Sequence, residues 1–464
     1  MSYALSEIMS RIEGGYCEVL GLGISNVPLC RWLAQKGAHI KGRDMKAESD
    51  IPHAAALREL GVELITGEDY LTTLGAAEPE KTVIFRAPGM RHDLPEISRA
   101  VSAGAVLTSE MELFLELTPA TVLGITGSDG KTTTTTITGK LLESELEGSG
   151  RRVYVGGNIG SPLLPKVDEM TDRDFAVVEL SSFQLMTARR SPNRSAITNI
   201  TPNHLNWHTG MDEYILAKQN IYLYEPCERV ILNAENRTTA CLASEAFLDV
   251  TLFSSKRELD RGVCLKDGGI YLNGEMILRT DEIILPGMHN VENYMTAIAL
   301  TDGFVSKESI RRVARTFTGV EHRCELVREK DGVKFYNSSI DSSPTRTAAA
   351  LSNFKVKPIV ICGGYDKNIP FEPLAVSLCA SAKAVVLTGA TAGKIKSAIL
   401  HCPDFAKSGL SVLDEPDFES AVKLAASLAS DGDCVLLSPG CASFDRFKNF
   451  EERGRTFKAI VNNL

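Results

Sequence analysis

The residues from Thr126 to Thr133, T-G-S-D-G-K-T-T, are the strongest chemical signal in the chain. Glycines in such a run let backbone N–H groups turn toward phosphate oxygens. Lys131 would neutralise the β- and γ-phosphate oxygens, and the hydroxyl of Thr132 can complete a magnesium shell. The run departs from the common phosphate-loop spacing, because Ile125 stands where the first glycine is expected. It predicts an Mg-ATP site, against the alternative of a glycine-rich turn with a solvated lysine.

A carboxylate that holds magnesium is expected at the same edge of the fold as this phosphate loop. The apolar run from Phe175 to Val178 predicts a strand that ends at Glu179, and ligands of open α/β sheets gather at the carboxyl ends of strands. His204 and Lys218 follow further along the chain. Taken alone, His204 fits a hydrogen-bonded core histidine and Lys218 fits a solvated helix face, so neither predicts a role by itself.

A second glycine-bearing turn lies near the N-terminus, after a predicted strand at 16–20 and before a predicted helix at 27–36, with another strand region at 39–44. This turn, Gly21 to Gly23, lacks the third glycine of the dinucleotide-binding fingerprint, because Asn26 stands in its place. It is therefore a weak signal for NAD. The free N–H groups and the dipole at a helix N-terminus still permit a phosphate there.

Alternating strand and helix patterns run from end to end of the chain and position these residues at strand ends. Further strands are predicted at 121–126, 174–180, 196–200, 229–232, 358–362, 384–388 and 434–437. Such alternation is typical of an α/β fold with mainly parallel sheets. The chain has 464 residues, about three times the usual ~150 of one domain. The sequence therefore predicts three α/β domains, with boundaries near residues 110 and 319.

The composition excludes several classes of protein. Hydrophobic residues make up 44% of the chain and charged residues 23%, and no apolar run reaches the ~18 residues that a membrane helix needs. No secretory signal is visible at the start, so we expect a soluble cytoplasmic protein. The 11 cysteines are scattered without a C-x-x-C pair, which favours reduced thiols. A net charge of -9 without basic runs argues against a nucleic-acid surface.

Taken together, the motifs resemble those of the Mur ligases, the amide-forming enzymes of peptidoglycan assembly, over nearly the whole chain. The motifs that carry the resemblance follow in family order: the phosphate loop, G-N-I-G from Gly157, E-L-S-S-F-Q-L from Glu179, the stretch from Asn199 to His208, L-P-G-M-H-N from Leu285 with Asn293, and His322 with Arg323. Two C-terminal stretches, Asn337 to Thr345 and Leu437 to Phe450, are similar to those of family members that add D-glutamate.

The resemblance implies a fold of three domains. A Rossmann-like domain over residues 1–110 would bind the UDP part of the substrate, a central domain over 111–319 would bind ATP, and a Rossmann-like domain over 320–464 would bind the incoming amino acid. It also implies that the γ-phosphate of ATP passes to the carboxylate of UDP-N-acetylmuramoyl-L-alanine, that D-glutamate attacks the acyl phosphate, and that a tetrahedral intermediate loses phosphate. The expected state is a monomer that binds neither nucleic acid nor a membrane.

The resemblance also implies roles for individual residues. Lys131, His204 and Lys218 would be catalytic, with Lys218 carbamylated so that its new carboxylate helps to hold magnesium. Magnesium would further contact Thr132, Glu179 and His204. The remaining expected contacts are, for ATP, Gly127, Ser128, Asp129, Gly130, Lys131, Thr132, Thr133, Asn290, Asn293, Arg323 and Asp341; for the UDP substrate, Ser25, Asn26, Asp44, Asn158 and His204; and for D-glutamate, Thr345, Arg346, Lys367, Ser443, Phe444 and Phe450.

Some positions depart from the family pattern. Ser343 stands where a lysine is familiar and Arg346 follows shortly after it, so we expect the charge contact to D-glutamate to be redistributed. Asn203 and Asn206 replace the usual aspartates around the predicted catalytic histidine. Asp129 stands in the phosphate loop where asparagine is common.

Four other functions share part of this pattern. Another amino-acid-adding Mur ligase is the nearest alternative. Folylpolyglutamate synthetase shares the phosphate loop and glutamate transfer, but a Rossmann-like UDP domain before that loop is not expected of it. An NAD-dependent oxidoreductase built on Gly21 to Gly23 would depend on nicotinamide without ATP turnover. A regulatory phosphate-loop switch would bind a partner in a nucleotide-dependent way without ligation.

Overall fold

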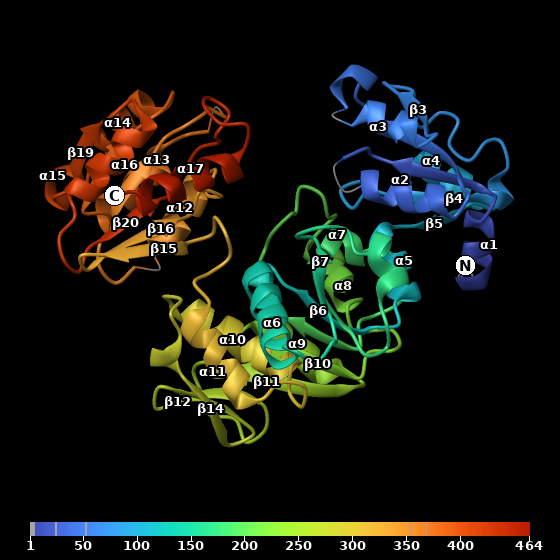
Figure 1. Ribbon diagram of the computed structural model, residues 1–464, viewed down its shortest axis with the longest axis horizontal. Helices are drawn as coiled ribbons and strands as arrows, with labels where there is room; N and C mark the ends of the chain where they lie inside the picture. Colours follow the sequence, from blue (N-terminus) through green and yellow to red (C-terminus); the bar gives the residue numbers. More distant parts are fainter. Residues whose placement is uncertain (1–4, 24–25, 52, 353, 368) are drawn as a thin grey trace. The chain divides into compact units, whose positions relative to one another are not determined.

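The computed structural model describes residues 5–23, 26–51, 53–352, 354–367 and 369–464. The chain forms two compact units, one ending at Thr280 and completed by Val291–Val313, the other made of Asp281–Asn290 and Ala314–Leu464. The described residues build three sheets, whose elements run from blue through green and yellow to red in Figure 1. Within these residues, no helix is both long enough and apolar enough to cross a membrane.

The N-terminal sheet is parallel throughout. Its strand order is β3-β2-β1-β4-β5, in which the direction of winding reverses beside β1, as in doubly wound folds. Every residue of β4 is buried, as expected of a parallel strand covered on both faces. Its strands are β1 (Tyr16–Leu20), β2 (His39–Asp44), β3 (Glu63–Thr66), β4 (Thr82–Arg86) and β5 (Val106–Thr108), and its helices are α1 (Leu5–Ile12), α2 (Asn26–Gln35), α3 (Ala54–Glu59), α4 (Pro95–Ser102) and α5 (Glu110–Leu117).

The central sheet joins a parallel part to an antiparallel edge. Its strand order is β14-β13-β12-β11-β10-β9-β6-β8-β7; the pairs from β7 to β12 are parallel, and β13 pairs antiparallel with β12 and β14. The strands are β6 (Thr121–Thr126), β7 (Val153–Gly157), β8 (Phe175–Glu179), β9 (Arg194–Ile197), β10 (Arg229–Asn233), β11 (Asp249–Ser254), β12 (Val263–Lys266), β13 (Gly269–Leu272) and β14 (Glu275–Arg279). The helices are α6 (Lys131–Glu145), α7 (Ser182–Leu185), α8 (Met211–Gln219), α9 (Arg237–Glu245), α10 (Met288–Leu300) and α11 (Lys307–Thr316).

The C-terminal sheet has the strand order β15-β16-β20-β17-β18-β19. β15 pairs antiparallel with β16, and the other neighbours are parallel. The strands are β15 (Glu325–Lys330), β16 (Val333–Asn337), β17 (Ile359–Cys362), β18 (Ala384–Leu387), β19 (Ser411–Asp414) and β20 (Cys434–Leu437). The helices are α12 (Pro344–Leu351), α13 (Glu372–Ser381), α14 (Ala392–Leu400), α15 (Phe405–Ser408), α16 (Phe418–Ser427) and α17 (Phe450–Asn462).

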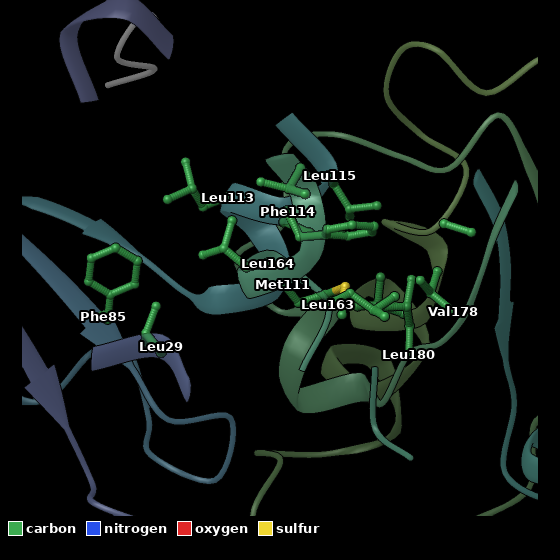
Figure 2. Packing of buried hydrophobic residues seen from close by; sticks show 14 of the residues in the cluster. Leu29, Phe85, Met111, Leu113, Phe114, Leu115, Leu163, Leu164, Val178 and Leu180 are labelled. Carbon is green, nitrogen blue, oxygen red and sulfur yellow. The ribbon is translucent and has the colours of Figure 1, made fainter. Parts of the chain in front are cut away.

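One apolar cluster runs through the first unit from the N-terminal sheet into the central one. Leu29 of α2 and Phe85 of β4 belong to the same cluster as Met111 and Phe114 of α5 and Leu180 after β8 (Figure 2). Each such side chain contributes about 1.5–3 kcal/mol when it is fully buried. This core therefore supports the strand ends from which both glycine-bearing turns leave.

The predicted α/β fold with mainly parallel sheets is confirmed. Strands occur with the predicted bounds at 16–20, 39–44, 121–126 and 434–437, and the others shift by a few residues. β9 ends at Ile197 rather than at residue 200, because Thr198 and Asn199 leave the ladder to bond the phosphate loop. The domain boundaries near 110 and 319 stay a prediction.

Candidate active site

The carboxyl ends of β6, β8 and β9 meet at one edge of the central sheet. In the parallel register Ile125 of β6 pairs with Glu179 of β8, and Thr126 pairs with Ile197 of β9. The phosphate loop leaves β6 at this edge, and α6 begins at Lys131. The structure thus brings together the loop and the carboxylate that sequence reasoning expected to be neighbours.

The phosphate loop is held by the segment that follows β9. Ser128 N donates to Asn199 O at 2.9 Å, and Asp129 N donates to Asn199 Oδ1 at 2.9 Å. Thr198 Oγ1 donates to Asp129 O at 2.6 Å. Gly127 has φ of 150°, and a Cβ there would lie 1.9 Å from Thr198 Oγ1. The loop therefore requires glycine at this position.

Lys131 folds back over the loop at the start of α6. Its Nζ donates to Gly127 O and Ser128 O, at 2.9 Å in each case. The first amides of an α-helix have no partner within the helix, and the half-buried Thr132 and Thr133 belong to this first turn. A helix N-terminus beside a lysine is suited to bind phosphate.

Asn293 of α10 lies against the same loop. A Cβ on Gly130 would meet Asn293 Oδ1 at 2.6 Å, and Thr134 Oγ1 donates to that oxygen at 3.1 Å. Gly130 itself has φ of 79° and precedes α6 without a side-chain cap. The close approach of Asn293 and the positive φ together require glycine at position 130.

Glu179 presents a buried carboxylate at the end of β8. The residue is 1% exposed; its Oε1 accepts a hydrogen bond from Asn158 Nδ2 at 2.7 Å. Its Oε2 is buried and has no hydrogen-bond partner in the part of the chain that the structure describes. A buried charged oxygen without a partner is costly, so this side chain fits a divalent cation. Ser181 and Gln184 form a capping box behind it, which fixes the chain where it leaves the strand.

Lys218 is a buried lysine on α8, with 1% exposure. Its Nζ donates to Gly127 O at 2.8 Å and to Thr126 Oγ1 at 3.3 Å. The same nitrogen lies 4.6 Å from the centroid of the Tyr214 ring. The side chain therefore points from the helix into the base of the phosphate loop, not into solvent as the sequence alone would favour.

The surroundings of Lys218 favour its neutral form. Burial holds the pKa of Lys218 well below its ordinary value, and the positive charge of Lys131 acts in the same direction. The carboxylates of Asp129 and Glu179 oppose the shift. A lysine is a nucleophilic amine only in its neutral form, and the lowered pKa favours that form.

His204 lies on the exposed side of the same edge. It has φ of 55°, and its ring packs edge-on against Phe183 with the centroids 4.9 Å apart. Partial burial lowers the pKa of His204, and the charges of Lys131 and Lys218 add to the effect. The positive charges of both lysines are thus felt at the imidazole.

The residues predicted for the UDP substrate lie at two sheet edges. Asp44, at the end of β2, accepts hydrogen bonds from Leu22 N at 2.7 Å and Lys46 N at 2.9 Å. The side chain of Asn26 donates to Gly21 O. Both side chains therefore brace the N-terminal glycine turn, whereas Asn158 and His204 belong to the central sheet. Ser25 lies outside the described residues.

Asp341 is the best-defined predicted nucleotide contact of the second unit. It is buried, and Ser438 Oγ donates to its Oδ2 at 2.8 Å. Burial raises the pKa of Asp341 to about 6, which Ser338, Ser438, Arg346 and Arg323 partly oppose. The charge of Arg323 is thus felt at Asp341. Asn290 donates through Nδ2 to Pro286 O at 2.7 Å.

The turns after β17 and β20 are tied together at the carboxyl edge of the C-terminal sheet. Tyr365 N donates to Ala442 O at 2.9 Å. Gly364 has φ of 150°, and a Cβ there would lie 2.2 Å from the same oxygen, so only glycine allows this contact. The exposed Lys367 follows and lines a small hollow of about 10 Å³ with Tyr365, Gly440 and Cys441.

Three of the predicted D-glutamate residues lie between the end of β20 and the start of α17. Phe444 is 63% exposed and packs edge-on against Tyr365, with ring centroids 6.0 Å apart. Ser443 Oγ is buried without a hydrogen-bond partner among the described residues. Phe450 begins α17 and packs against His322, with centroids 6.0 Å apart.

The two residues at the start of α12 are exposed. Thr345 Oγ1 lies 3.2 Å from Ser343 Oγ, so the serine that departs from the family pattern bonds within its own turn. Arg346 Nη1 donates to Ile340 O at 3.2 Å. The arginine is therefore anchored in part, with its remaining donors toward solvent or ligand.

Sequence reasoning missed residues that shape the site. Tyr214 bonds Ser128 Oγ at 3.0 Å and faces Lys218; its place one turn before Lys218 on the predicted helix is the signal that could have found it. Tyr365 had no such signal, because its partner Ala442 is remote in sequence. Among the described residues, no group of three or more His, Cys, Asp and Glu side chains could hold a metal by itself.

Family models match most of the central and C-terminal parts of the chain. The Mur ligase middle domain matches residues 125–301, and the Mur ligase, glutamate ligase domain, matches residues 322–441. Both matched segments contain the sheet edges described above.

Curated proteins match the chain from end to end. Proteins named UDP-N-acetylmuramoylalanine--D-glutamate ligase are 45% identical in Acetivibrio thermocellus and 47% identical in Clostridium beijerinckii, each with 100% of both chains covered. Among solved structures, UDP-N-acetylmuramate-alanine ligase MurC from Thermotoga maritima is similar with a TM-score of 0.58 and 19% identity, over 97% of this chain and 99% of that one. This last similarity concerns the fold alone.

Proposed function

This chain belongs to the Mur ligase family, and we propose that it is the ATP-dependent ligase that joins D-glutamate to UDP-N-acetylmuramoyl-L-alanine in peptidoglycan precursor synthesis. The observation that carries the proposal is the meeting of the phosphate loop, Glu179 and Lys218 at one edge of the central sheet. The full-length relatives named for this reaction support the identity of the amino acid.

The reaction needs charge neutralisation more than it needs an acid or a base. A carboxylate oxygen of the UDP substrate bonds the γ-phosphorus of ATP, and ADP leaves with the electrons of the broken bond. The amine of D-glutamate then bonds the acyl carbon and gives up a proton, and inorganic phosphate leaves. Lys131 and the N-terminal amides of α6 bind the phosphate oxygens through these steps, and the loop backbone orients them.

We assign the magnesium site to Glu179, with Thr132 and His204 beside it. The buried, unpartnered Oε2 of Glu179 supports this assignment. When bound, the ion would neutralise charge on the transferring phosphoryl group. Because the described side chains do not form a full ligand set, oxygens of the nucleotide would supply the remaining ligands.

Carbamylation of Lys218 would supply a further oxygen ligand. The lowered pKa of Lys218 favours the neutral amine, which bonds the carbon of CO2 and releases a proton. A carbamate would replace a cation by an anion directly under the phosphate loop. It would then accept from neighbouring donors and draw magnesium toward the loop.

Each of the three sheets would belong to a domain with its own role. We propose that residues 1–110 bind the UDP group through Ser25, Asn26 and Asp44, that 111–319 bind ATP, and that 320–464 bind D-glutamate. Asn158 and His204 would contact the muramoyl end of the substrate from the central sheet. Asn290, Asn293, Arg323 and Asp341 would hold the nucleotide, in which Asp341 accepts from hydroxyl groups. All these elements come from one chain, so we expect a monomer, working in the cytoplasm where ATP is supplied.

The D-glutamate site is assigned to the exposed surface around Lys367 and Phe444, at the carboxyl edge of the C-terminal sheet. Lys367 and Arg346 would bind the carboxylates of the amino acid. Thr345 and the unpartnered Ser443 hydroxyl would donate hydrogen bonds, and the exposed ring of Phe444 and the ring of Phe450 would close the sides. Arg346 supplies the charge that the lysine replaced by Ser343 would have given.

Lys367→Ala should raise the Michaelis constant for D-glutamate roughly ten- to two-hundred-fold, because one charge-assisted contact is worth about 1.5–3 kcal/mol. The constants for ATP and the UDP substrate should change much less. Arg346→Ala should give a smaller effect of the same kind, since its Nη1 already donates to Ile340 O. Steady-state kinetics with each substrate varied in turn measure the three constants.

Lys423→Ala is the matched control, because Lys423 is an exposed lysine of the same unit that pairs with Glu419 on α16. Its constants should equal those of the wild type. An unchanged constant for D-glutamate in Lys367→Ala would remove the lysine from the site.

The second-order rate constant kcat/KM for ATP should fall as the pH drops below about 6, because protonation of Asp341 removes its negative charge and turns one of its two acceptor oxygens into a donor. The pKa of Asp341 is raised to about 6 in the folded chain, so the ionised form is complete only above that pH. Asp341→Asn should lower the constant and flatten this limb of the profile. Asp433→Asn is the control, since Asp433 pairs with Lys383 at 2.5 Å instead. A limb retained in Asp341→Asn would contradict the assignment.

A phosphate-release assay with UDP-N-acetylmuramoyl-L-alanine, ATP and magnesium, run across candidate amino acids, tests the proposed function. We expect release with D-glutamate and little with L-glutamate, L-alanine or a diamino acid. A stronger response to one of the other amino acids would contradict the D-glutamate identity and leave the family membership standing.

A further inference from the structure

His208 is a buried histidine to which the proposed reaction gives no role. Its side chain is 0% exposed. Nδ1 lies 3.2 Å from Glu213 Oε2, and Nε2 lies 2.9 Å from Ser182 Oγ. Both ring nitrogens are thus used, and each bonds a different element of the central sheet region.

The direction of these hydrogen bonds follows from the charge on Glu213. Hydrogen bonds from Arg91 hold the pKa of Glu213 at about 2, so its carboxylate only accepts. Nδ1 of His208 must therefore carry the proton. Burial lowers the pKa of His208, which leaves Nε2 as an acceptor for the Ser182 hydroxyl. The result is a chain of hydrogen bonds in which Ser182 donates to His208 and His208 donates to Glu213.

A serine, a histidine and a carboxylate in this order are also the parts of a nucleophilic triad. Ser182 is only 2% exposed, however, and the ring of His208 is fully covered. No substrate atom can reach a hydroxyl in that position. The role of this hydrogen-bond chain is therefore structural: it holds other parts of the protein in place.

The three members of the chain lie on the three segments that bear the proposed ligands of phosphate and metal. Ser182 begins α7 directly behind Glu179. His208 N donates to His204 O at 3.0 Å. Glu213 lies on α8, the helix of Lys218. One imidazole thus ties together the segments of all three groups.

Aromatic contacts extend the network to the phosphate loop. The ring of Phe183 stacks on His208 with centroids 5.6 Å apart. The ring of Tyr214 meets His208 edge-on at 5.2 Å, and its hydroxyl bonds Ser128 Oγ at 3.0 Å. A displacement of the imidazole would therefore be felt at the loop as well as at the ligands.

We propose that His208 is a positioning residue for the ligation: through Ser182 and Glu213 it sets the distances among Glu179, His204, Lys218 and the phosphate loop. The proposal rests on the proposed function, because the reaction is what requires these groups to be aligned. A misplacement of about 1 Å in such a site can cost roughly a hundredfold in rate.

Two substitutions of His208 each remove one of the two hydrogen bonds of its imidazole. His208→Asn keeps an N–H near the position of Nδ1 and loses the acceptor for Ser182. His208→Gln keeps an acceptor near the position of Nε2 and loses the bond to Glu213. Ser182→Ala removes the same link as His208→Asn without changing the histidine. His401→Asn is the matched control, since His401 is an exposed histidine at the end of α14 that bonds only its own helix turn in the described contacts.

Steady-state kinetics and circular dichroism on these variants test the proposal. We expect His208→Asn and Ser182→Ala to lower kcat by about ten- to a hundredfold, with the Michaelis constant for D-glutamate within twofold and the far-ultraviolet spectrum unchanged. The two changes together should cost no more than the larger single one, because they break one link. His208→Gln should keep more of kcat than His208→Asn, and His401→Asn should match the wild type.

Two outcomes would overturn the positioning role. One is a kcat within twofold of wild type in both His208→Asn and Ser182→Ala. The other is a loss of rate that only matches the loss of folded protein. Wild-type enzyme assayed beside the variants separates this proposal from the function: no ligation of D-glutamate by the wild type contradicts the proposed function and this role with it, whereas normal wild-type ligation with unchanged variants contradicts the positioning role alone.

Discussion

Lys131→Ala should reduce ligation by about a thousandfold or more while the fold remains intact. The lysine supplies positive charge where the transferring phosphoryl group is held, and single groups of this kind contribute about a hundred- to a hundred-thousandfold in rate. In the free chain its Nζ donates to two loop carbonyl oxygens, and such bonds add about 0.5–1.5 kcal/mol each to stability. Product formation and thermal unfolding, measured on the same preparation, give the two quantities.

Lys140→Ala is the control for this change, because Lys140 is an exposed residue of the same helix that pairs with Glu143. It should ligate at the wild-type rate. Turnover close to wild type in Lys131→Ala would remove the phosphate loop from the reaction.

Lys218→Ala should be almost inactive and should recover in part when acetate or propionate is added. Lys218 is buried beneath the phosphate loop with a strongly lowered pKa, so a carbamate on its Nζ would be an anion that no neighbouring side chain replaces. A short carboxylate that enters the space left by the side chain can restore oxygen ligands. Initial rates over a range of carboxylate concentrations, with chloride as the salt control, measure the recovery.

Lys218→Arg separates charge from carbamate chemistry, because a guanidinium keeps the cation but stays protonated. It should be as inactive as Lys218→Ala. Leu216→Ala, at an exposed position of the same helix, should behave as wild type. Full activity of Lys218→Ala or Lys218→Arg without added carboxylate would exclude the residue from the mechanism.

The parallel strands could be predicted from the sequence because each is a short apolar run that ends in a glycine-bearing turn. β4 and β8 are buried along their whole length, and hydrophobic runs of this kind mark strands covered on both faces. The antiparallel strands β13 and β15 had no comparable signal: the first is half-exposed at its end and the second mixes Glu, Arg and Lys with apolar residues. Tertiary pairing, not local pattern, fixes such strands.

The parts of the candidate site that consist of residues adjacent in sequence could be predicted. The parts that depend on contacts between residues distant in sequence could not. The phosphate loop and Glu179 could be placed at one edge because parallel strands align their ends. The burial of Lys218 could not, since an isolated lysine on a helix favours a solvated position. The role of His208 could not be predicted either. Its partners Ser182 and Glu213 come from separate elements, and no spacing in the sequence indicates that the three side chains are in contact.

The transfer of labelled oxygen tests most directly the claim that this chain joins D-glutamate to an ATP-activated carboxylate. UDP-N-acetylmuramoyl-L-alanine labelled with oxygen-18 in its carboxylate is incubated with ATP, magnesium, D-glutamate and the enzyme, and phosphate and product are analysed by mass spectrometry. We predict one labelled phosphate and one ADP for each D-glutamyl product, and no product when D-glutamate is withheld. Unlabelled phosphate, or ATP consumed without an amide product, would contradict the claim.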